Sequence, residues 1–200
     1  SLKLFKEKLS KYNIGLEIIK TKTYKSFFEK LFLKKNFSFY WNKIYEPKYL
    51  LFDSYLKKNF EKNKIDFQIF KGNILNEISE VKKQDGTPFK VFTPFWRTAE
   101  KHYFDKIPPK ERKISKCKKQ LSFFNNIIDE EQIYPKNKWS KKFEKYWSPD
   151  EDHANKELKN FIKNRIENYS ESRNFPNEIG TSKLSPYIKH GQIHVETIWE

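Results

Sequence analysis

The sequence predicts an α/β region followed by an all-helical region, with a long connector between them. Helical and strand-like hydrophobic patterns alternate up to about residue 90, periodicity fails from 106 to 146, and helical stripes return after 147. Alternating helices and strands are typical of a parallel sheet with crossover helices, so we expect a partial Rossmann-like sheet in the first region. The predicted domains are therefore 1–105, 106–146 and 147–200.

In the α/β region, apolar residues recur at intervals of three to four in the helices and run continuously in the short strands. The predicted elements, in order, are a helix at 2–12 that Gly15 ends, a buried strand at 16–19, a helix at 24–35, a strand at 37–41, a helix at 47–63 and a strand at 65–70. An irregular loop follows Gly72. Thr93 then has the position of an N-cap before Pro94, which predicts a helix to about Phe104.

The connector combines the adjacent prolines at 108–109, six basic residues from Lys110 to Lys119, and three acidic residues at 129–131. Such charge blocks are typical of a solvated surface, although contact with phosphate is the open alternative for the basic run. The connector also contains five scattered large residues, which indicate that it packs against something. They are Leu121, Phe123, Phe124, Tyr134 and Trp139.

The helical region begins with a strong start signal. Ser148 and Glu151 have capping-box spacing, and Pro149 occupies the first turn. An apolar stripe extends this helix to about Asn168. We expect a further helix from Ser185 to Gly191, and a last one from about Gln192.

Composition limits the function classes. The 200 residues include 41 Lys and Arg against 26 Asp and Glu, a net charge of +15, which argues against basic partners and favours polyanions. Most of the excess is lysine, which is also typical of A/T-rich coding. With 36% hydrophobic and 18% aromatic residues, the chain can bury a core and does not resemble a disordered protein.

Cellular location and completeness follow from rarer residues. Cys117 is the only cysteine, which excludes an internal disulfide and suits a reducing compartment. No stretch reaches about 18 apolar residues, so we expect no membrane contact. We also expect a cytoplasmic location and a monomer. The sequence lacks methionine, and we therefore expect Ser1 to lie within a longer protein.

Several catalytic chemistries find little support. The five glycines fit neither a dinucleotide fingerprint nor a Walker loop. His190 and His194 are four apart, but Gly191 interrupts the helix between them, so we favour ordinary histidines over metal ligands. Cys117 lies among lysines but has no identifiable base partner, which argues against a catalytic thiol.

The stretch Gly-Thr-Ser-Lys-Leu-Ser-Pro at 180–186 differs from these. Three hydroxyls and a lysine stand before a predicted helix, where hydroxyl, ammonium and backbone N–H donors converge on one anion. This pattern suits a phosphate group. Ordinary capping by Ser185 is the alternative that spacing leaves open.

These residues resemble the flavin domain of the DNA photolyase/cryptochrome family. That domain carries a tyrosine, an Arg-x-x-Pro and then Gly-Thr-Ser-x-Leu-Ser-Pro-Tyr, which match Tyr169, 173–176 and 180–187. Three further blocks agree in order: Tyr-Glu-Pro at 45–47, the stretch at 85–96, and the Trp-x-Pro-x-Glu-x-x-Ala pattern at 147–154. The chain is most similar to a bacterial class I cyclobutane pyrimidine dimer photolyase, as an internal fragment.

The resemblance implies a light-driven repair enzyme, a deoxyribodipyrimidine photo-lyase that splits pyrimidine dimers in ultraviolet-damaged DNA with electrons from reduced FAD. It also implies an antenna-type α/β domain and the start of the helical FAD-binding domain. The implied FAD-binding residues are Tyr169, Thr181, Ser182, Lys183, Leu184 and Ser185. The implied DNA-binding residues are Arg173 and Arg97, and a salt bridge to Glu171 or Glu178 is the alternative for Arg173.

Some assignments stay open. Lys48 and Tyr49 stand where some relatives hold a folate, so a second antenna chromophore of folate or deazaflavin type is unsettled. Tyr45, Thr93 and Trp147 are interpreted as structural. A cryptochrome-type photoreceptor without repair activity is the main alternative, and a basic nucleic-acid-binding module without flavin is a third. Because the remainder of the flavin domain is absent, the 200-residue chain alone is expected to be inactive.

Overall fold

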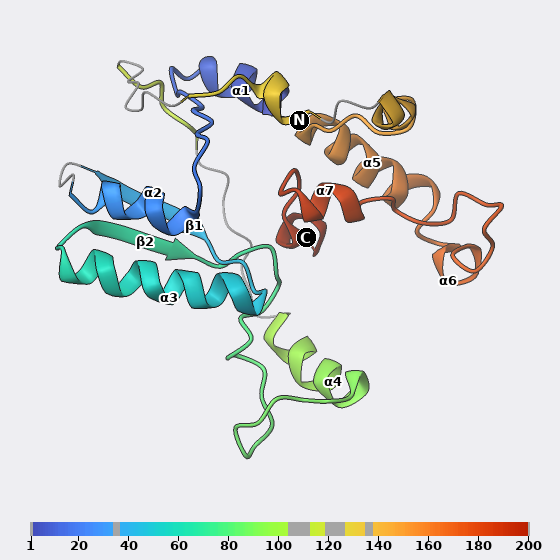
Figure 1. Ribbon diagram of the computed structural model, residues 1–200. Helices are drawn as coiled ribbons and strands as arrows, with labels where there is room; N and C mark the ends of the chain where they lie inside the picture. Colours follow the sequence, from blue (N-terminus) through green and yellow to red (C-terminus); the bar gives the residue numbers. More distant parts are fainter. Residues whose placement is uncertain (1, 34–36, 104–112, 119–126, 135–137, 200) are drawn as a thin grey trace. The chain divides into compact units, whose positions relative to one another are not determined.

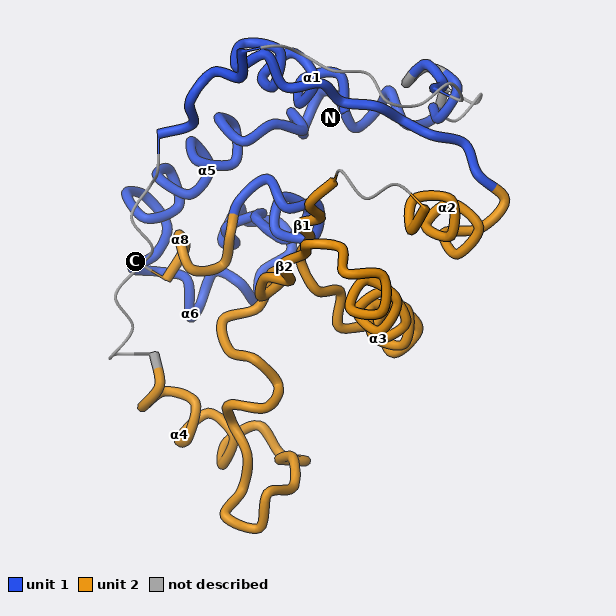
Figure 2. Tube along the Cα trace, turned by 90° about the vertical axis from the view of Figure 1, so that its left-hand side faces the viewer, with its two compact units in different colours: residues 1–21, 111–193 blue, residues 22–110, 194–200 orange. Residues whose placement is uncertain are grey.

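The computed structural model describes residues 2–33, 37–103, 113–118, 127–134 and 138–199. The chain divides into two units that interleave along the sequence, and Figure 2 colours them separately. Unit 1 comprises Ser1–Thr21 and Glu111–Ile193, whereas unit 2 comprises Lys22–Lys110 and His194–Glu200. The predicted domain boundaries at 105/106 and 146/147 stay a prediction.

Unit 2 contains a parallel sheet of two strands (Figure 1). Strand β1 (Ser38–Asn42) pairs with β2 (Asp66–Phe70), with Ser38 opposite Asp66. Helix α3 (Pro47–Lys62) connects the two strands, because parallel neighbours need a crossover. Pro47 starts this helix, where its missing N–H has no intrahelical partner to lose. The predicted α/β class is confirmed, and these three elements lie within a residue or so of their predicted bounds.

The core of this sheet region is aromatic and centres on Phe60 of α3, which is fully buried. Its ring stacks on Phe39 of β1 at a centroid distance of 4.8 Å and meets the Phe67 ring of β2 at 5.5 Å. Helix α2 (Tyr24–Leu31) lies against the same ring through Phe28, at 6.2 Å. Both strands alternate exposed and half-buried residues, so their inward side chains form one face toward this ring.

A smaller cluster of unit 2 surrounds helix α4 (Phe92–Tyr103), whose Ala99 packs with Val81. Helix α8 (Val195–Trp199) also belongs to this unit, and its Trp199 ring meets Trp96 of α4 at 6.1 Å. An ion pair between Lys71, just after β2, and Glu196 adds a second contact. The last described helix is thus fastened to unit 2 by both ring packing and charge.

Unit 1 is helical in its described part. It comprises α1 (Leu2–Ser10), the 3₁₀ turns η1 (Glu130–Ile133) and η2 (Lys138–Phe143), α5 (Glu151–Asn164), α6 (Tyr169–Ser172) and α7 (Ser185–Lys189). Lys8 of α1 pairs with Glu151 at 3.1 Å and Asp152 at 3.3 Å, which ties α1 to the first turn of α5.

Two predictions for the first twenty residues are wrong. Residues 16–19 form no strand of the sheet, because Ile19 makes only an isolated antiparallel bridge to Ile127 of the connector. The first helix ends at Ser10 rather than Tyr12, and Asn13 then takes the left-handed conformation (φ 56°) ahead of Gly15. A short amide side chain tolerates that conformation, so the chain turns before the glycine is reached.

Other element ends also differ from prediction. Helix α2 ends at Leu31, short of the predicted Lys35. Helix α4 begins at Phe92, so Thr93 lies inside the first turn and does not cap it. Helix α5 ends at Asn164 rather than Asn168, and α8 begins at Val195 rather than Gln192. Of the five large connector residues expected to pack, Leu121, Phe123 and Phe124 lie outside the described residues. The prediction is wrong for Tyr134 and Trp139, which are 50% and 56% exposed.

Within the described ranges, none of the helices combines the length and the apolar character that a membrane span needs.

Replacing Phe60 by alanine tests the aromatic core. Because the ring is fully buried among other rings, Phe60→Ala should lower the free energy of unfolding by about 3–5 kcal/mol. Denaturant unfolding followed by circular dichroism measures this loss. Lys58→Ala, on the exposed side of the same helix, is the matched control and should change stability by less than about 0.5 kcal/mol. Equal losses in the two variants would contradict the assignment of Phe60 as the core centre.

Candidate functional site

The predicted hydroxyl-rich segment joins α6 to α7 in unit 1, and its start packs tightly against α6. Gly180 is buried, and a Cβ built on it would stand only 2.4 Å from the carbonyl carbon and oxygen of Ser172. Only glycine permits this approach of two backbones. The segment at 180–185 is therefore held directly beside the helix that carries Tyr169.

Within the segment, side chains alternate between the protein and solvent. Thr181 and Lys183 are exposed, whereas Leu184 is only 2% exposed. Lys183 adopts the left-handed conformation (φ 55°), and the N–H of Leu184 donates to the Ser182 Oγ at 3.4 Å. This sharp turn places a lysine and a threonine on the outside while a leucine anchors the backbone.

The start of α7 resolves the capping alternative for Ser185. Its N-cap residue is Leu184, and no side chain caps the helix. Ser185 is the first helical residue and is exposed. Capping therefore does not explain the third hydroxyl, and Thr181, Ser182 and Ser185 remain a set of donors near one turn.

Tyr169 begins α6 (Tyr169–Ser172) and Arg173 directly follows it, and their side chains are in contact. The guanidinium carbon of Arg173 stands 5.6 Å from the centre of the Tyr169 ring, a cation–π distance. The same ring meets Phe161 of α5 edge-on at 5.6 Å. Among the described residues, Arg173 makes this ring contact rather than the alternative salt bridge to Glu171 or Glu178.

Arg97, the other predicted DNA-binding residue, is an exposed residue of α4 and belongs to unit 2.

Tyr45, interpreted as structural, donates its hydroxyl to Glu77 at 3.0 Å and accepts from the Gly72 N–H at 3.3 Å. Thr93 is exposed in the first turn of α4.

Sequence reasoning missed the pair that fixes the start of α7. Tyr187 is 1% exposed, its hydroxyl lies 2.7 Å from His153 Nδ1 on α5, and its ring meets Trp147 at 5.7 Å. Tyr187 ends the motif at 180–187, and Trp147 opens the motif at 147–154. The presence of each in a family motif was the signal that could have pointed to this contact. The interpretation of Trp147 as structural agrees with this packing.

The cap of α5 also differs from the capping-box prediction. Asp150, not Ser148, is the N-cap, and its carboxylate accepts from the His153 N–H at 2.7 Å while the Ser148 hydroxyl donates to it at 2.5 Å. Partial burial alone would raise the pKa of the Asp150 carboxyl, but these two donors favour the charged form and hold its pKa below the ordinary 3.8.

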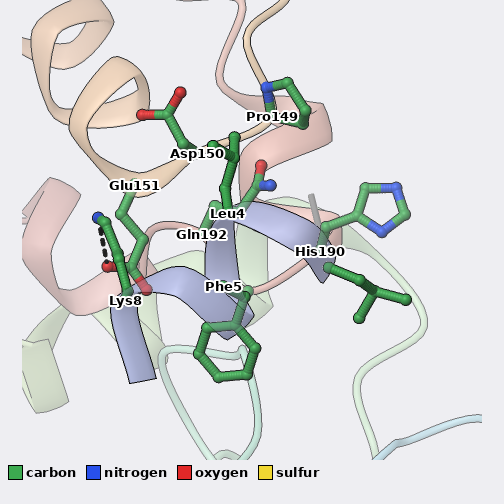
Figure 3. Close-up of a pocket in the computed structure, with 10 residues that line it drawn as sticks. Leu4, Phe5, Lys8, Pro149, Asp150, Glu151, His190 and Gln192 are labelled. Atoms are coloured by element: carbon green, nitrogen blue, oxygen red, sulfur yellow. Dashed lines mark hydrogen bonds and ion pairs between the residues drawn. The ribbon is translucent and has the colours of Figure 1, made fainter. Parts of the chain in front are cut away.

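Figure 3 shows a pocket of about 270 Å³ in unit 1, formed by α1, the start of α5 and the turn after α7. Its lining residues are Leu2, Leu4, Phe5, Lys8, Pro149, Asp150, Glu151, His190, Gly191 and Gln192. The eight predicted cofactor- and DNA-binding residues are not among them. This pocket therefore lends no support to the flavin assignment, which rests on the exposed segment itself.

The donors of the segment fit one ligand class. Three hydroxyls and one ammonium can all donate to phosphate oxygens. They lie within five residues, around the left-handed turn at Lys183. A metal centre has less support, since the part of the chain with described positions holds no cluster of three or more His, Cys, Asp or Glu side chains.

Comparison with known proteins decides the family. The family model described as DNA photolyase matches residues 1–113, more than half of the chain. This chain belongs to the DNA photolyase family. Members bind flavin cofactors and act on damaged DNA.

Two curated photolyases are similar to this chain. A deoxyribodipyrimidine photo-lyase of Agrobacterium fabrum is 30% identical over 159 residues, covering 80% of this chain and 33% of the relative. Another, from Alkalihalophilus pseudofirmus, is 35% identical over 148 residues, covering 69% of this chain and 28% of the relative. The chain thus spans about a third of the length of these photolyases.

A solved structure has the same fold. The crystal structure of a bacterial class III photolyase from Agrobacterium tumefaciens matches with a TM-score of 0.82 and 25% identity, covering all of this chain and 41% of the other. The sequence motifs indicated class I. Since the family is common to both, the class to which this chain belongs stays a prediction.

Replacing Gly180 by alanine tests the contact that places the segment. A methyl group cannot occupy space 2.4 Å from the Ser172 carbonyl, so Gly180→Ala should displace the loop and cost about 1–3 kcal/mol. Thermal unfolding measures the cost, and limited proteolysis between 173 and 184 should become faster. Thr181→Ala, at the exposed neighbouring residue, is the control. Unchanged proteolysis in Gly180→Ala would show that the two backbones do not meet.

Removing the Asp150 cap should destabilise α5 in a pH-dependent way. Asp150→Ala should cost about 0.5–2 kcal/mol near neutral pH because the His153 N–H loses its acceptor. The folded-state pKa lies below 3.8, so the stabilising carboxylate is present above that value and is lost as pH falls through the folded-state pKa. The stability difference from the parent sequence should therefore shrink on acidification.

Denaturant unfolding at neutral pH and near pH 3 measures this difference. Glu167→Ala, at an exposed position beyond the end of α5, supplies the control. A stability loss that is the same at both pH values would rule out the charged cap.

Proposed function

We propose that this chain is part of a photolyase that repairs cyclobutane pyrimidine dimers with light, using FAD bound in part by the segment at 180–185. The observation that carries the proposal is the placement of three hydroxyls and a lysine in one turn, in a chain of the DNA photolyase family. When bound, the flavin supplies the excited electron that splits the dimer. The residues of this chain bind the flavin and orient it.

In this proposal, Thr181, Ser182 and Ser185 donate hydroxyl hydrogen bonds to the diphosphate of FAD, and Lys183 neutralises its charge. Leu184 holds the turn in place because its side chain is buried and its N–H is bonded to Ser182. Tyr169 lies on the helix against which Gly180 packs, and we assign its ring to the same ligand. A fixed set of donors costs little entropy when a phosphate arrives.

Arg173 and Arg97 are proposed to contact DNA phosphates. Arg173 is exposed, and its contact with the Tyr169 ring orients the guanidinium without neutralising its charge. Arg97 is exposed on α4. The net charge of +15 raises the rate at which a polyanion such as DNA arrives. A damaged, poorly stacked dimer costs less to flip out of the duplex than intact bases do.

A cryptochrome-type photoreceptor is the second candidate. The observation in its favour is that cryptochrome-1 of Arabidopsis thaliana is 26% identical over 167 residues, covering 80% of this chain and 24% of the relative. We favour photolyase because both photo-lyases described above are more similar. A cytoplasmic monomer is proposed in either case, and the folate or deazaflavin antenna remains part of the photolyase proposal.

The decisive experiment uses the protein of the complete reading frame. It should carry bound FAD and restore dimer-containing DNA only in blue light, whereas the 200-residue chain should retain no stoichiometric flavin. A flavin-loaded protein without light-dependent repair would favour the cryptochrome alternative. Absence of flavin from the complete protein would overturn both.

Variants of that protein separate the two sets of residues. Ser182→Ala combined with Lys183→Ala should lower flavin occupancy, measured by absorbance, because a charge-assisted donor and a hydroxyl are lost. Arg173→Ala should weaken binding to dimer-containing duplex about tenfold at unchanged occupancy. Ser170→Ala and Lys163→Ala, both at exposed positions, are the matched controls. Full occupancy in the double variant would refute the assigned diphosphate contacts.

A further inference from the structure

The end of the connector exposes three large aromatic side chains within eight residues. The exposed fractions are 56% for Trp139, 53% for Phe143 and 68% for Tyr146. We call residues 139–146 the aromatic segment. Isolated exposed aromatics are common, but three in one short segment form an apolar surface that folding of unit 1 leaves uncovered.

The backbone of the aromatic segment is ordered by hydrogen bonds. Residues 138–143 form the turn η2, and the Phe143 carbonyl accepts from the N–H groups of Tyr146 at 2.8 Å and Trp147 at 2.9 Å. Trp147 is half-buried, and its ring packs on the buried Tyr187. The exposed rings are thus attached to the packed part of unit 1 and not to a free tail.

Two of the three rings contact each other, and the third contacts a cation. Trp139 and Phe143 meet edge to face, with centroids 5.8 Å apart and an interplanar angle of 84°. The Lys145 Nζ stands 5.6 Å from the centre of the Tyr146 ring. An edge-to-face pair covers one ring face only, and both side chains are more than half exposed, so planar groups can stack on this surface.

Positive charge accompanies these rings. Lys141, Lys142 and Lys145 are exposed within the segment, and Glu144 is its only acidic residue. An uncharged apolar partner would bury these ammonium groups at high cost. A second copy of the chain would bring like charges together. The fitting partner offers planar rings and negative charge at short intervals.

We propose that the aromatic segment binds single-stranded nucleic acid, with unpaired bases stacked on Trp139, Phe143 and Tyr146 and phosphates paired with the three lysines. Aromatic platforms within a basic groove are the general solution for binding single strands without sequence preference. This contact needs neither flavin nor a lesion. It is therefore independent of the residues assigned to repair, and it can hold whether or not the repair proposal does.

The test measures fluorescence anisotropy of a labelled oligothymidylate of about 12 nucleotides with the 200-residue chain. An abasic strand of equal length and charge is the comparison. The oligothymidylate should bind more tightly, and Trp139→Leu combined with Tyr146→Leu should weaken its binding about tenfold or more. The same variant should leave the abasic strand unaffected, because only stacking is removed.

Electrostatics give a second readout. Three phosphate contacts predict that log K falls with log salt concentration with a slope of about −2 for a single strand. Lys141→Glu combined with Lys142→Glu should reduce that slope by more than half. Lys58→Glu combined with Lys62→Glu on α3, which changes the net charge equally, is the matched control and should reduce it less.

Tyr24→Leu, at a ring that is 62% exposed in unit 2, controls for loss of any exposed aromatic, and circular dichroism shows that each variant is folded. Equal affinity for the abasic and base-containing strands would overturn the proposal. So would an aromatic variant that binds both strands as before, or one that changes only self-association or binding to anionic lipid vesicles.

Discussion

The buried ring of Tyr187 fixes the parts of unit 1 on which its candidate sites depend. Its hydroxyl bonds to His153 on α5, and its ring packs against Trp147 at the end of the connector. Because a buried phenol needs a hydrogen-bond partner, His153 and Tyr187 constrain each other's position. One side chain thereby sets where α7 begins and where the aromatic segment ends.

The segment at 180–185 separates positioning from binding. Gly180 and Leu184 are buried and hold the backbone, whereas Thr181, Lys183 and Ser185 are exposed and can donate to a ligand. Polar groups that are solvated before binding cost the fold nothing to maintain, in contrast to a buried charge. This division explains how a short segment can tolerate a left-handed lysine and still hold a defined shape.

Local signals in the sequence predicted some elements well and others poorly. Pro47 and the strong periodicity after it located α3, and the aromatic strands at 37–41 and 65–70 located the sheet, because these patterns depend on neighbours in the sequence. Ile19 pairs with Ile127, more than a hundred positions away, which no local pattern shows. At α5, Asp150 rather than Ser148 is the N-cap, and its charged carboxylate accepts from the His153 N–H, which a cap at Ser148 could not have used. The motif located the candidate site, but it did not show that Gly180 touches α6 or that Tyr187 anchors α7.

The abundance of lysine alone is weak evidence for nucleic-acid binding, since A/T-rich coding raises lysine throughout a protein. Such a bias also raises phenylalanine and tyrosine, but folding should then bury those rings, as it does around Phe60. The aromatic segment departs from this expectation, because Phe143 and Tyr146 stay exposed beside lysines while Trp147 next to them is packed. Composition therefore accounts for which residues are present in the segment, whereas their exposure on an ordered turn calls for a partner with both rings and charge.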